Sequence, residues 1–211
     1  MSRASGLVVL FLVGLAFLSA CSGERQATIV RPEPIVATRS SASTSAPKLD
    51  EGIDLRARAA ATIAAIHARD VTTLAAYVHP DKGVRFAPYR FPDATDVVLD
   101  ATHVRTAFSD PTRRLWGAYD GSGEPIEGRF TDYFDQFVGD VDFAIAPHVG
   151  AVQPADPELA AAFPGAMVVE YRFDGFDPKF EGMDWRALRL VFQQDDGRWW
   201  LVGVVHDQWM I

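Results

Sequence analysis

The loop from His79 to Arg85 combines one imidazole with two cationic side chains. Its sequence is His79-Pro80-Asp81-Lys82-Gly83-Val84-Arg85. Because a proline and a glycine force a tight local path, His79, Lys82 and Arg85 could face one anionic ligand. The simpler interpretation is a turn that stops the preceding helix, with the histidine and the lysine close to the exposed helix carbonyls. No second catalytic group lies nearby in the sequence, which favours the turn.

A second pair of titratable side chains, His206 and Asp207, lies at the end of the last predicted strand. Adjacent strand residues point to opposite faces of a sheet, so these two side chains cannot form a His–Asp dyad with each other. If one face lines a pocket, the residue on that face could act as a general base. The alternative is that His206 is a hydrogen-bonded histidine that closes the edge of the core.

Two further charges interrupt apolar strands. Glu170 lies in the run Ala166 to Phe173, and Arg189 lies in the run Trp185 to Gln193. If these strands are neighbours, we expect an ion pair across the sheet, although a pair inside a cavity could equally orient a polar ligand. Trp185 or another of the five tryptophans could form the floor of a ligand pocket, whereas most of them are expected in the core.

Familiar cofactor motifs are missing. The segment Asp120-Gly121-Ser122-Gly123-Glu124 lacks the alternating ligands and the distal glutamate of a calcium loop, so we interpret it as a turn. The sequence contains no Gly-x-Ser-x-Gly elbow and no His-Glu-x-x-His zinc helix. We therefore expect no cofactor and no bound metal.

The elements that must position these side chains follow from periodicity and turn residues. Helical spacing of apolar residues predicts the N-terminal helices, and long apolar runs separated by turns predict the C-terminal strands. Helices followed by strands indicate an α+β domain in which N-terminal helices pack on a curved antiparallel sheet. The predicted helices are 54–69, 70–78, 102–108 (capped by Thr102), one that begins at the capping Thr131, and a helical turn at 157–162; the predicted strands are 83–89, 115–119, 126–130, 166–173, 185–193 and 199–206.

Cys21 is the single cysteine of the chain, and it ends an apolar N-terminal stretch. The residues Leu18-Ser19-Ala20-Cys21 resemble the bacterial lipobox, in which the cysteine thiol receives a diacylglyceryl group and the chain is cleaved just before it. The resemblance implies a signal peptide over residues 1–20 and a lipid anchor at Cys21. A lone cysteine also excludes intramolecular disulfides and cysteine metal clusters.

Residues 21–50 are rich in Pro, Ser and Ala, which is typical of a disordered tether between the lipidated cysteine and a single domain at 51–211. The non-acidic Ser22 favours an outer membrane that faces the periplasm, if the source is Gram-negative. Loss of residues 1–20 removes one positive charge and takes the net charge from −8 to −9. A protein with this net negative charge is a poor candidate for binding nucleic acid or the surface of anionic lipid. We therefore expect membrane contact through the lipid anchor.

Four segments carry a wider resemblance. They are Val78 to Phe86, Trp116 to Ile126, Gly182-Met183-Asp184-Trp185 and His206-Asp207-Gln208-Trp209, and they resemble a group of bacterial lipoproteins of unassigned function. The order of helices and strands is also similar to the cone-shaped fold shared by nuclear transport factor two and ketosteroid isomerase. That second resemblance implies a pocket between the bent sheet and the helices.

These observations lead to an expected function. We expect an envelope lipoprotein that binds a small ligand or a partner protein without catalysis. One alternative is a pocket enzyme of isomerase, dehydratase or hydrolase type with His206, Asp207 or His79 as its general base. Another is an assembly adaptor that works through its sheet face.

Overall fold

The computed structural model describes residues 54–209. Several helices begin at an aspartate whose side chain accepts backbone N–H groups of the first turn, as Asp54 and Asp70 do. The helices are α1 (Leu55–His67), α2 (Val71–Tyr77), α3 (Ala101–Thr106), α4 (Phe130–Phe137) and α5 (Pro157–Ala162), with 3₁₀ turns η1 (Phe143–Ile145) and η2 (Pro178–Phe180).

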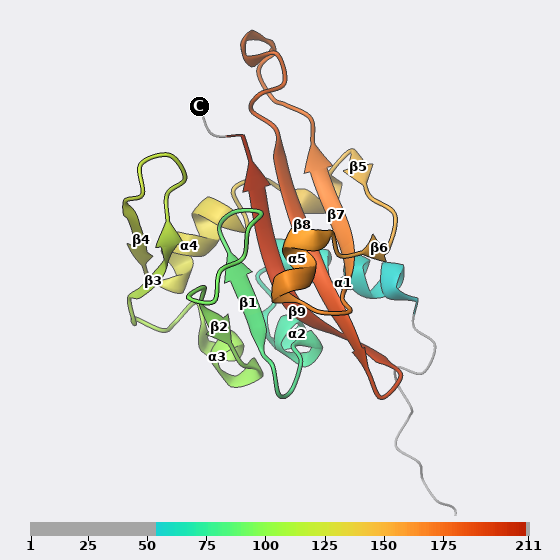
Figure 1. Cartoon of the computed structure of the whole chain (residues 1–211). Helices are drawn as coiled ribbons and strands as arrows, with labels where there is room; N and C mark the ends of the chain where they lie inside the picture. Colours follow the sequence, from blue (N-terminus) through green and yellow to red (C-terminus); the bar gives the residue numbers. More distant parts are fainter. Residues whose placement is uncertain (1–53, 210–211) are drawn as a thin grey trace, which may run out of the picture. The chain divides into compact units, whose positions relative to one another are not determined.

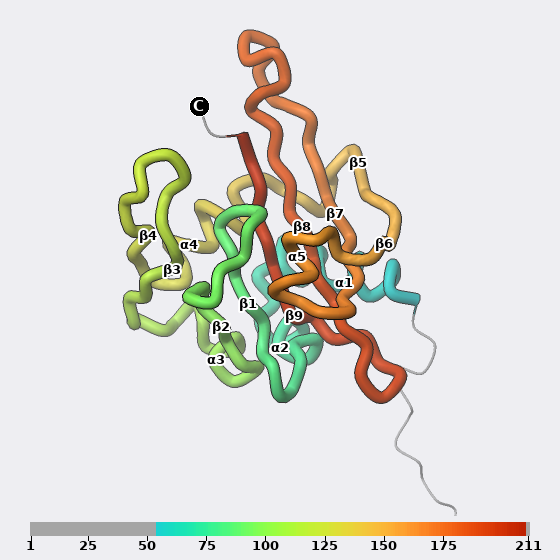
Figure 2. Tube along the Cα trace, viewed as in Figure 1, coloured from blue at the N-terminus to red at the C-terminus, as the bar shows by residue number. Residues whose placement is uncertain are grey.

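The larger sheet has the strand order β2-β1-β9-β8-β7-β5, and β6 also pairs with β7. Its pairings are antiparallel except that β1 runs parallel to β9, its neighbour in space despite their distance in sequence (Figure 2). β3 and β4 form a separate hairpin. The strands are β1 (Val84–Ala87), β2 (Val98–Leu99), β3 (Arg114–Ala118), β4 (Pro125–Gly128), β5 (His148–Val149), β6 (Gln153–Pro154), β7 (Met167–Phe173), β8 (Arg186–Asp195) and β9 (Arg198–Gln208).

The two faces of the larger sheet are covered by different helices. Figure 1 shows α5 in front of the sheet and α1, α2 and α4 behind it. The strands alternate accordingly, so that Leu188 and Leu190 belong to the core behind the sheet while Val191 packs under α5. These features make the described part an α+β fold of helices on a largely antiparallel sheet, as the sequence predicts.

The space between the helices and the sheet is filled with aromatic side chains. Trp116 stacks on Tyr133 with ring centroids 4.3 Å apart, and Phe86 and Phe130 meet at 5.4 Å, edge to face. All four rings are buried. These rings fill the part of the space between α4 and the sheet where the cone-fold resemblance implies a pocket.

Most predicted elements are present, but two predicted caps are wrong. α3 is capped by Asp100, whose carboxylate accepts the N–H of His103, and not by Thr102. α4 begins at Phe130 after Arg129, and Asp132 accepts the Arg129 N–H, so Thr131 lies inside the helix. In both places an aspartate, a better acceptor than a threonine hydroxyl, takes the exposed donors. The predicted signal peptide, Cys21 and the tether lie outside the described residues.

Candidate functional site

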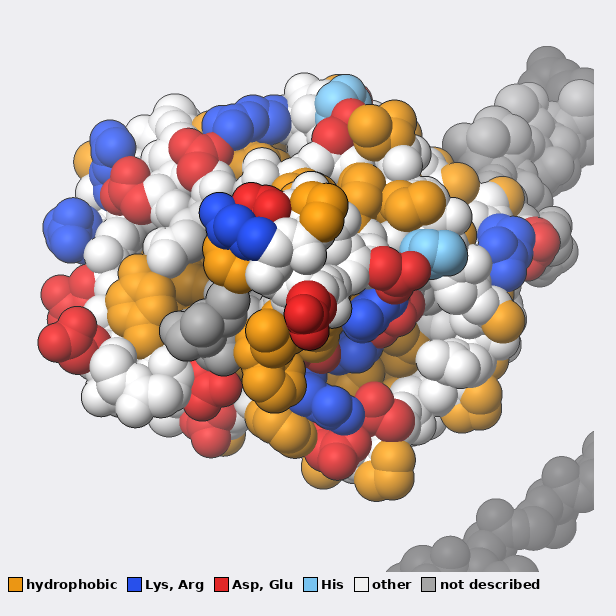
Figure 3. Space-filling view, turned by 90° about the horizontal axis from the view of Figure 1, so that it is seen from above, with side chains coloured by type: hydrophobic (Ala, Val, Ile, Leu, Met, Phe, Trp, Pro, Cys, Tyr) orange, Lys and Arg blue, Asp and Glu red, His pale blue; other side chains and the backbone are white. Residues whose placement is uncertain are grey.

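The main candidate site is a cleft between the β1–β2 connection and the β3–β4 hairpin. It consists of two hollows, of about 480 and 610 Å³, that share Tyr89, Phe91, Ala118 and Gly123. We call it the aromatic cleft, because Tyr89, Phe91, Tyr119, Trp185 and Trp209 line it. Figure 3 looks onto the end of the sheet where β9 finishes and shows hydrophobic side chains beside charged ones of both signs.

Packing holds some of these rings, whereas others are open to solvent. Tyr89 contacts Phe137 edge to face at 5.9 Å, and the Tyr119 hydroxyl bonds to the Gln136 side chain of α4. Phe91 and Trp209 are 63% and 52% exposed. The cleft thus combines fixed rings on its inner side with open apolar rings at its rim, an arrangement typical of ligand sites.

The hairpin closes one side of the cleft by approaching β1 closely. Gly117 has φ +131°, and a Cβ at this position would lie 3.2 Å from the Pro88 ring. The connection of the hairpin is closed by hydrogen bonds from the Tyr119 N–H to the Glu124 carbonyl and from the Gly123 N–H to the Tyr119 carbonyl. Residues 120–124 therefore form a turn, as the sequence indicates.

Asp96 gives the cleft a titratable group. It lines the hollow of about 480 Å³, is only 7% exposed, and accepts the N–H of Asp93 at 2.7 Å. Burial raises the pKa of the Asp96 carboxyl to about 6, against the lowering effects of that hydrogen bond and of Arg85. A carboxyl that titrates near neutrality in a cleft is a candidate for binding or proton transfer.

Polar groups complete the wider hollow. Asp120, Asp207, Gln208 and Arg90 line it together with the rings. The Arg90 guanidinium lies over the Phe91 ring at 5.0 Å. The wall thus offers carboxylate acceptors and guanidinium and amide donors beside flat apolar surfaces.

Of the residues predicted from the sequence, Trp185 and Asp207 lie in this cleft. Trp185 is half-buried, and the Arg172 guanidinium covers its ring at 4.2 Å. Asp207 forms an ion pair of 2.7 Å with Arg189, which also pairs with Glu170 at 2.8 Å. The predicted pair of Glu170 and Arg189 is confirmed, directly opposite each other on β7 and β8.

The environment of Arg189 explains why this charged ladder is tolerated in a sheet. Its side chain is 13% exposed, and those of Glu170 and Asp207 are 25% and 7% exposed. Burial acts to lower the pKa of Arg189, but the two carboxylates outweigh burial and hold that pKa above its usual value. The three side chains therefore form one ionised network on the face of the sheet that α5 also contacts.

His79 lies apart from this cleft in a tight turn. Its Nδ1 accepts the N–H groups of Asp81 and Lys82 at 3.2 Å each, and its ring is 2% exposed. Burial lowers the pKa of His79, and the Lys82 ammonium adds to the effect. The ring thus organises the turn that leads into β1, while Lys82 and Arg85 line a different groove.

His206 points to the opposite face of β9 from Asp207 and is fully buried. Its Nδ1 lies 3.2 Å from the Pro88 carbonyl oxygen, its Nε2 lies 3.4 Å from the Asp140 carboxylate, and its ring meets Phe137 edge to face. Both ring nitrogens therefore face oxygen atoms inside the protein. This geometry matches the histidine at the edge of the core that the sequence allowed as an alternative.

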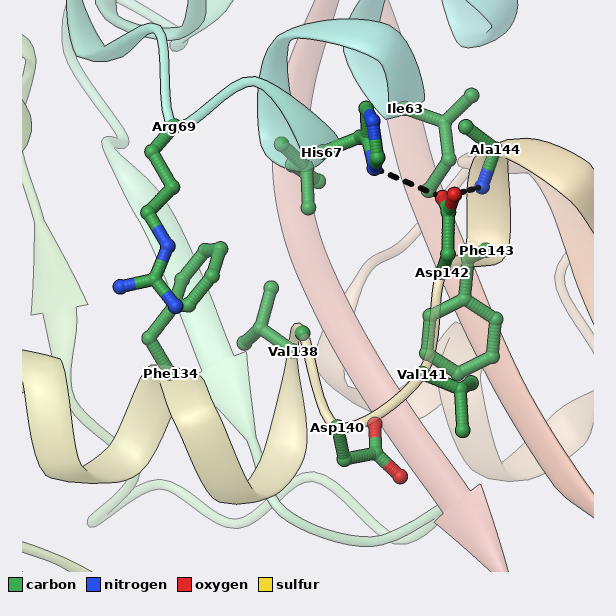
Figure 4. Close-up of a pocket in the computed structure, with 12 residues that line it drawn as sticks. Ile63, His67, Arg69, Phe134, Val138, Asp140, Val141, Asp142, Phe143 and Ala144 are labelled. Carbon is green, nitrogen blue, oxygen red and sulfur yellow. Dashed lines mark hydrogen bonds and ion pairs between the residues drawn. The ribbon is translucent and has the colours of Figure 1, made fainter.

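A smaller hollow of about 220 Å³ lies between α1 and the segment that follows α4. Figure 4 shows His67 of α1 directed at Asp142, and Asp142 also accepting the N–H of Ala144. The His67 and Asp142 side chains are partly exposed and already paired with each other. This hollow is smaller than either hollow of the aromatic cleft, and fewer aromatic side chains line it than line the cleft as a whole.

The described residues contain no cluster of three or more His, Cys, Asp or Glu side chains placed to hold a metal ion. Within residues 54–209, none of the helices has the length and apolar character that crossing a bilayer requires.

Sequence reasoning missed Asp96, Tyr89, Phe91 and Tyr119. A signal was present in Pro88-Tyr89-Arg90-Phe91-Pro92, because two large aromatic residues stand there in a connection between strands, and binding residues are concentrated on such connections. Asp96 gave no such signal, since only the three-dimensional structure buries it.

Comparison with known proteins gives little further guidance. No protein-family model matches the chain, and no curated protein matches it either. One solved structure that it resembles is a calcium/calmodulin-dependent protein kinase II association domain from Xanthomonas campestris, at 13% identity and a TM-score of 0.33, over 73% of this chain and 84% of that one. So low a score adds nothing to the fold assignment, which rests on the helices and the sheet themselves.

Proposed function

We propose that this protein binds a small ligand in the aromatic cleft without catalysis, as a lipid-anchored component of a bacterial envelope. The observation that carries the proposal is the meeting of five aromatic side chains from four separate segments around one hollow of about 610 Å³. Ligand sites favour such concave, mainly apolar walls with a few polar groups.

The composition of the cleft describes the ligand in outline. Flat rings favour a ligand with an apolar face, whereas Asp120, Gln208 and Arg90 offer hydrogen bonds at its edge. The carboxylate of Asp207 is already compensated by Arg189, so it adds little net charge. A compact ligand with both apolar and polar sides fits these walls.

The location rests on the lipobox resemblance at Cys21. A diacylated cysteine followed by a long Pro- and Ser-rich segment would hold the domain near a membrane while leaving the cleft open to its surroundings. Since the chain is acidic, the lipid and not surface charge would supply the attachment.

The test uses N-phenyl-1-naphthylamine, a neutral aromatic fluorophore, with the chain from Ser22 to Ile211. Binding should raise its fluorescence, and the double variant Phe91→Ser/Trp209→Ser should weaken binding at least tenfold, because both rings are exposed at the rim. The control is Phe176→Ser, which removes a 51% exposed ring outside the cleft. Equal binding by the native chain and the double variant would reject the cleft as the ligand site.

Asp96 supports a second candidate function, proton-transfer chemistry in the same cleft. Its pKa of about 6 leaves the carboxylate largely ionised at pH 7 and able to accept a proton. If the protein turns over a substrate there, its rate should fall below pH 6 and be lost in Asp96→Asn. Turnover that survives this substitution would turn attention back to His206, Asp207 and His79.

A further inference from the structure

A second groove lies under the end of α5, and its floor is apolar. Phe163, Val202 and Val98 contribute to a hollow of about 410 Å³. The register of β8 and β9 shifts here, with Val191 opposite Gly203 and Phe192 opposite Leu201, so Val202 is an extra residue in the strand. In a regular strand, Val202 and Gly203 would face opposite sides of the sheet. Because of the bulge, both face α5, and Val202 joins the apolar cluster there.

Two cations, Lys82 and Arg85, form one wall of this groove. The Lys82 ammonium donates to the Gln193 side-chain oxygen at 2.7 Å, and the Gln193 amide donates to the Pro164 carbonyl at 2.7 Å. This short chain of hydrogen bonds fixes the ammonium across the groove. The position of the positive charge is therefore set before any ligand arrives.

Arg85 is fixed in a similar way. Its Nη1 donates to the Asp93 carbonyl at 3.2 Å, and its guanidinium lies 5.6 Å from the centre of the Phe163 ring. Its Nε is buried and has no hydrogen-bond partner among the described residues. This atom has almost no accessible surface, so it is not a donor for a ligand. The hydrogen bond to Asp93 and the contact with the Phe163 ring hold the guanidinium at the wall of the groove.

Neither cation has a carboxylate within ion-pair distance in the part of the chain that the structure describes, whereas many of the other basic side chains do. The charge of Arg85 does act at longer range on Asp93 and Asp96, where it acts to lower the pKa of each carboxyl. The chain carries 28 acidic and only 20 basic residues, so acidic partners are abundant. Lys82 and Arg85 are thus held beside an apolar floor without a carboxylate in direct contact. An anion that also has an apolar part would match this arrangement.

We propose that this groove, which we call the basic groove, binds a carboxylate on an apolar chain, of the class of a medium-chain fatty acid. The carboxylate would accept hydrogen bonds from Lys82 and Arg85, and the chain would cover Phe163, Val98 and Val202. This site is separate from the aromatic cleft, and the proposal does not depend on a ligand there.

The experiment measures binding of sodium decanoate, below its micelle-forming concentration, to the chain from Ser22 to Ile211 by titration calorimetry. Acetate supplies the charge without the chain, and decanol supplies the chain without the charge. We expect decanoate to bind at least tenfold more tightly than either. Absence of decanoate binding, or equal binding of decanol, would overturn the proposal.

The variants locate the site. Lys82→Met should weaken decanoate binding at least tenfold, and so should Gln193→Glu, which gives Lys82 an internal carboxylate partner without removing any cation. Arg105→Gln is the matched control, because Arg105 is an exposed cation on α3 that bonds to the Ala101 carbonyl. If both groove variants bind like the native chain, the assignment fails.

A final variant separates the two sites. Phe91→Ser/Trp209→Ser alters the aromatic cleft and should leave decanoate affinity unchanged. Loss of decanoate binding in this variant would place the fatty acid in the cleft and overturn the basic groove, whether or not the cleft has its own ligand.

Discussion

At the scale of single residues, buried titratable groups in this protein serve different ends. The His79 ring uses Nδ1 as an acceptor for two backbone N–H groups, so its burial serves the turn before β1. Asp96 is largely buried, but it lines a hollow of the aromatic cleft. Its carboxylate accepts one backbone hydrogen bond, at 2.7 Å. Its carboxylate is consequently held in an environment that disfavours its charge.

Asp96→Asn should stabilise the protein at pH 7. The folded-state pKa of about 6 lies above the ordinary 3.8, so the folded protein holds this proton more tightly, and stability is lost as pH rises from about 4 to 6. A neutral amide avoids this loss, so the variant should gain about 2 kcal/mol at pH 7 and nothing at pH 4. Urea unfolding at both pH values measures the difference.

The control for this prediction has the opposite sign. Asp110 pairs with Arg114 at 2.7 Å, and its hydrogen bonds with Thr112 and Arg114 hold the pKa of its carboxyl far below the ordinary value. Asp110→Asn should therefore lose stability at pH 7. If Asp96→Asn is destabilising at pH 7 as well, burial of the Asp96 charge carries no cost and our account of the cleft carboxyl is wrong.

At the scale of elements, one ionic network connects the neighbouring strands β7, β8 and β9. The sequence of a single strand does not reveal it. The sequence predicts that Glu170 and Arg189 meet if their strands are neighbours, because each charge interrupts an apolar run, and β7 and β8 are indeed paired. Asp207 could not be added from the sequence, because its partner depends on the register of β8 against β9, where a bulge shifts the pairing. Arg189 consequently forms ion pairs with two carboxylates, those of Glu170 and Asp207.

Removal of Arg189 should cost more than removal of either acid. Arg189→Met strands two partly buried carboxylates side by side and should lower the free energy of unfolding by about 3 kcal/mol, whereas Glu170→Gln leaves the bond of Arg189 to Asp207 and should cost about 1 kcal/mol. The triple variant with Asp207→Asn should recover most of the loss. Thermal melts of the series measure this order, and equal losses for the two single variants would contradict the network.

The packing of α5 on β9 depends on a missing side chain. A Cβ on Gly203 would lie 2.7 Å from the Phe163 ring, so Gly203→Ala should displace α5 and cost about 1 to 3 kcal/mol. Gly150→Ala is the matched control, because its added Cβ would meet Glu170 at an ordinary 3.5 Å. Urea unfolding compares the two, and an unchanged midpoint for Gly203→Ala would show that α5 moves freely.

At the scale of the whole molecule, the helices and strands could be predicted from the sequence better than the aromatic cleft and the basic groove. Periodicity and turn residues locate the C-terminal strands within one or two residues, because these patterns are local. The aromatic cleft joins segments as distant as Tyr89 and Trp209, which no local pattern connects. The basic groove was partly predictable, since Lys82 and Arg85 stood out as paired cations, but Phe163 joins them only through α5.

The proposed lipid anchor depends on Cys21, which lies outside the described residues. If the lipobox resemblance holds, Cys21→Ser removes the thiol that accepts the diacylglyceryl group, and the chain should appear as uncleaved precursor or soluble protein. The domain that the structure describes should keep its fold, because the apolar clusters of residues 54–209 do not include the substituted position.

Metabolic labelling with a radioactive fatty acid tests the anchor directly. The native chain should incorporate label and sediment with membranes, and Cys21→Ser should do neither. Ser22→Ala is the matched control, because it changes the adjacent residue and keeps the thiol. A double- or triple-chain anchor holds a protein far more firmly than one acyl chain, so the loss should be nearly complete. Label that persists on the Cys21→Ser variant would show that the protein reaches the membrane by another route and that the lipobox resemblance misleads.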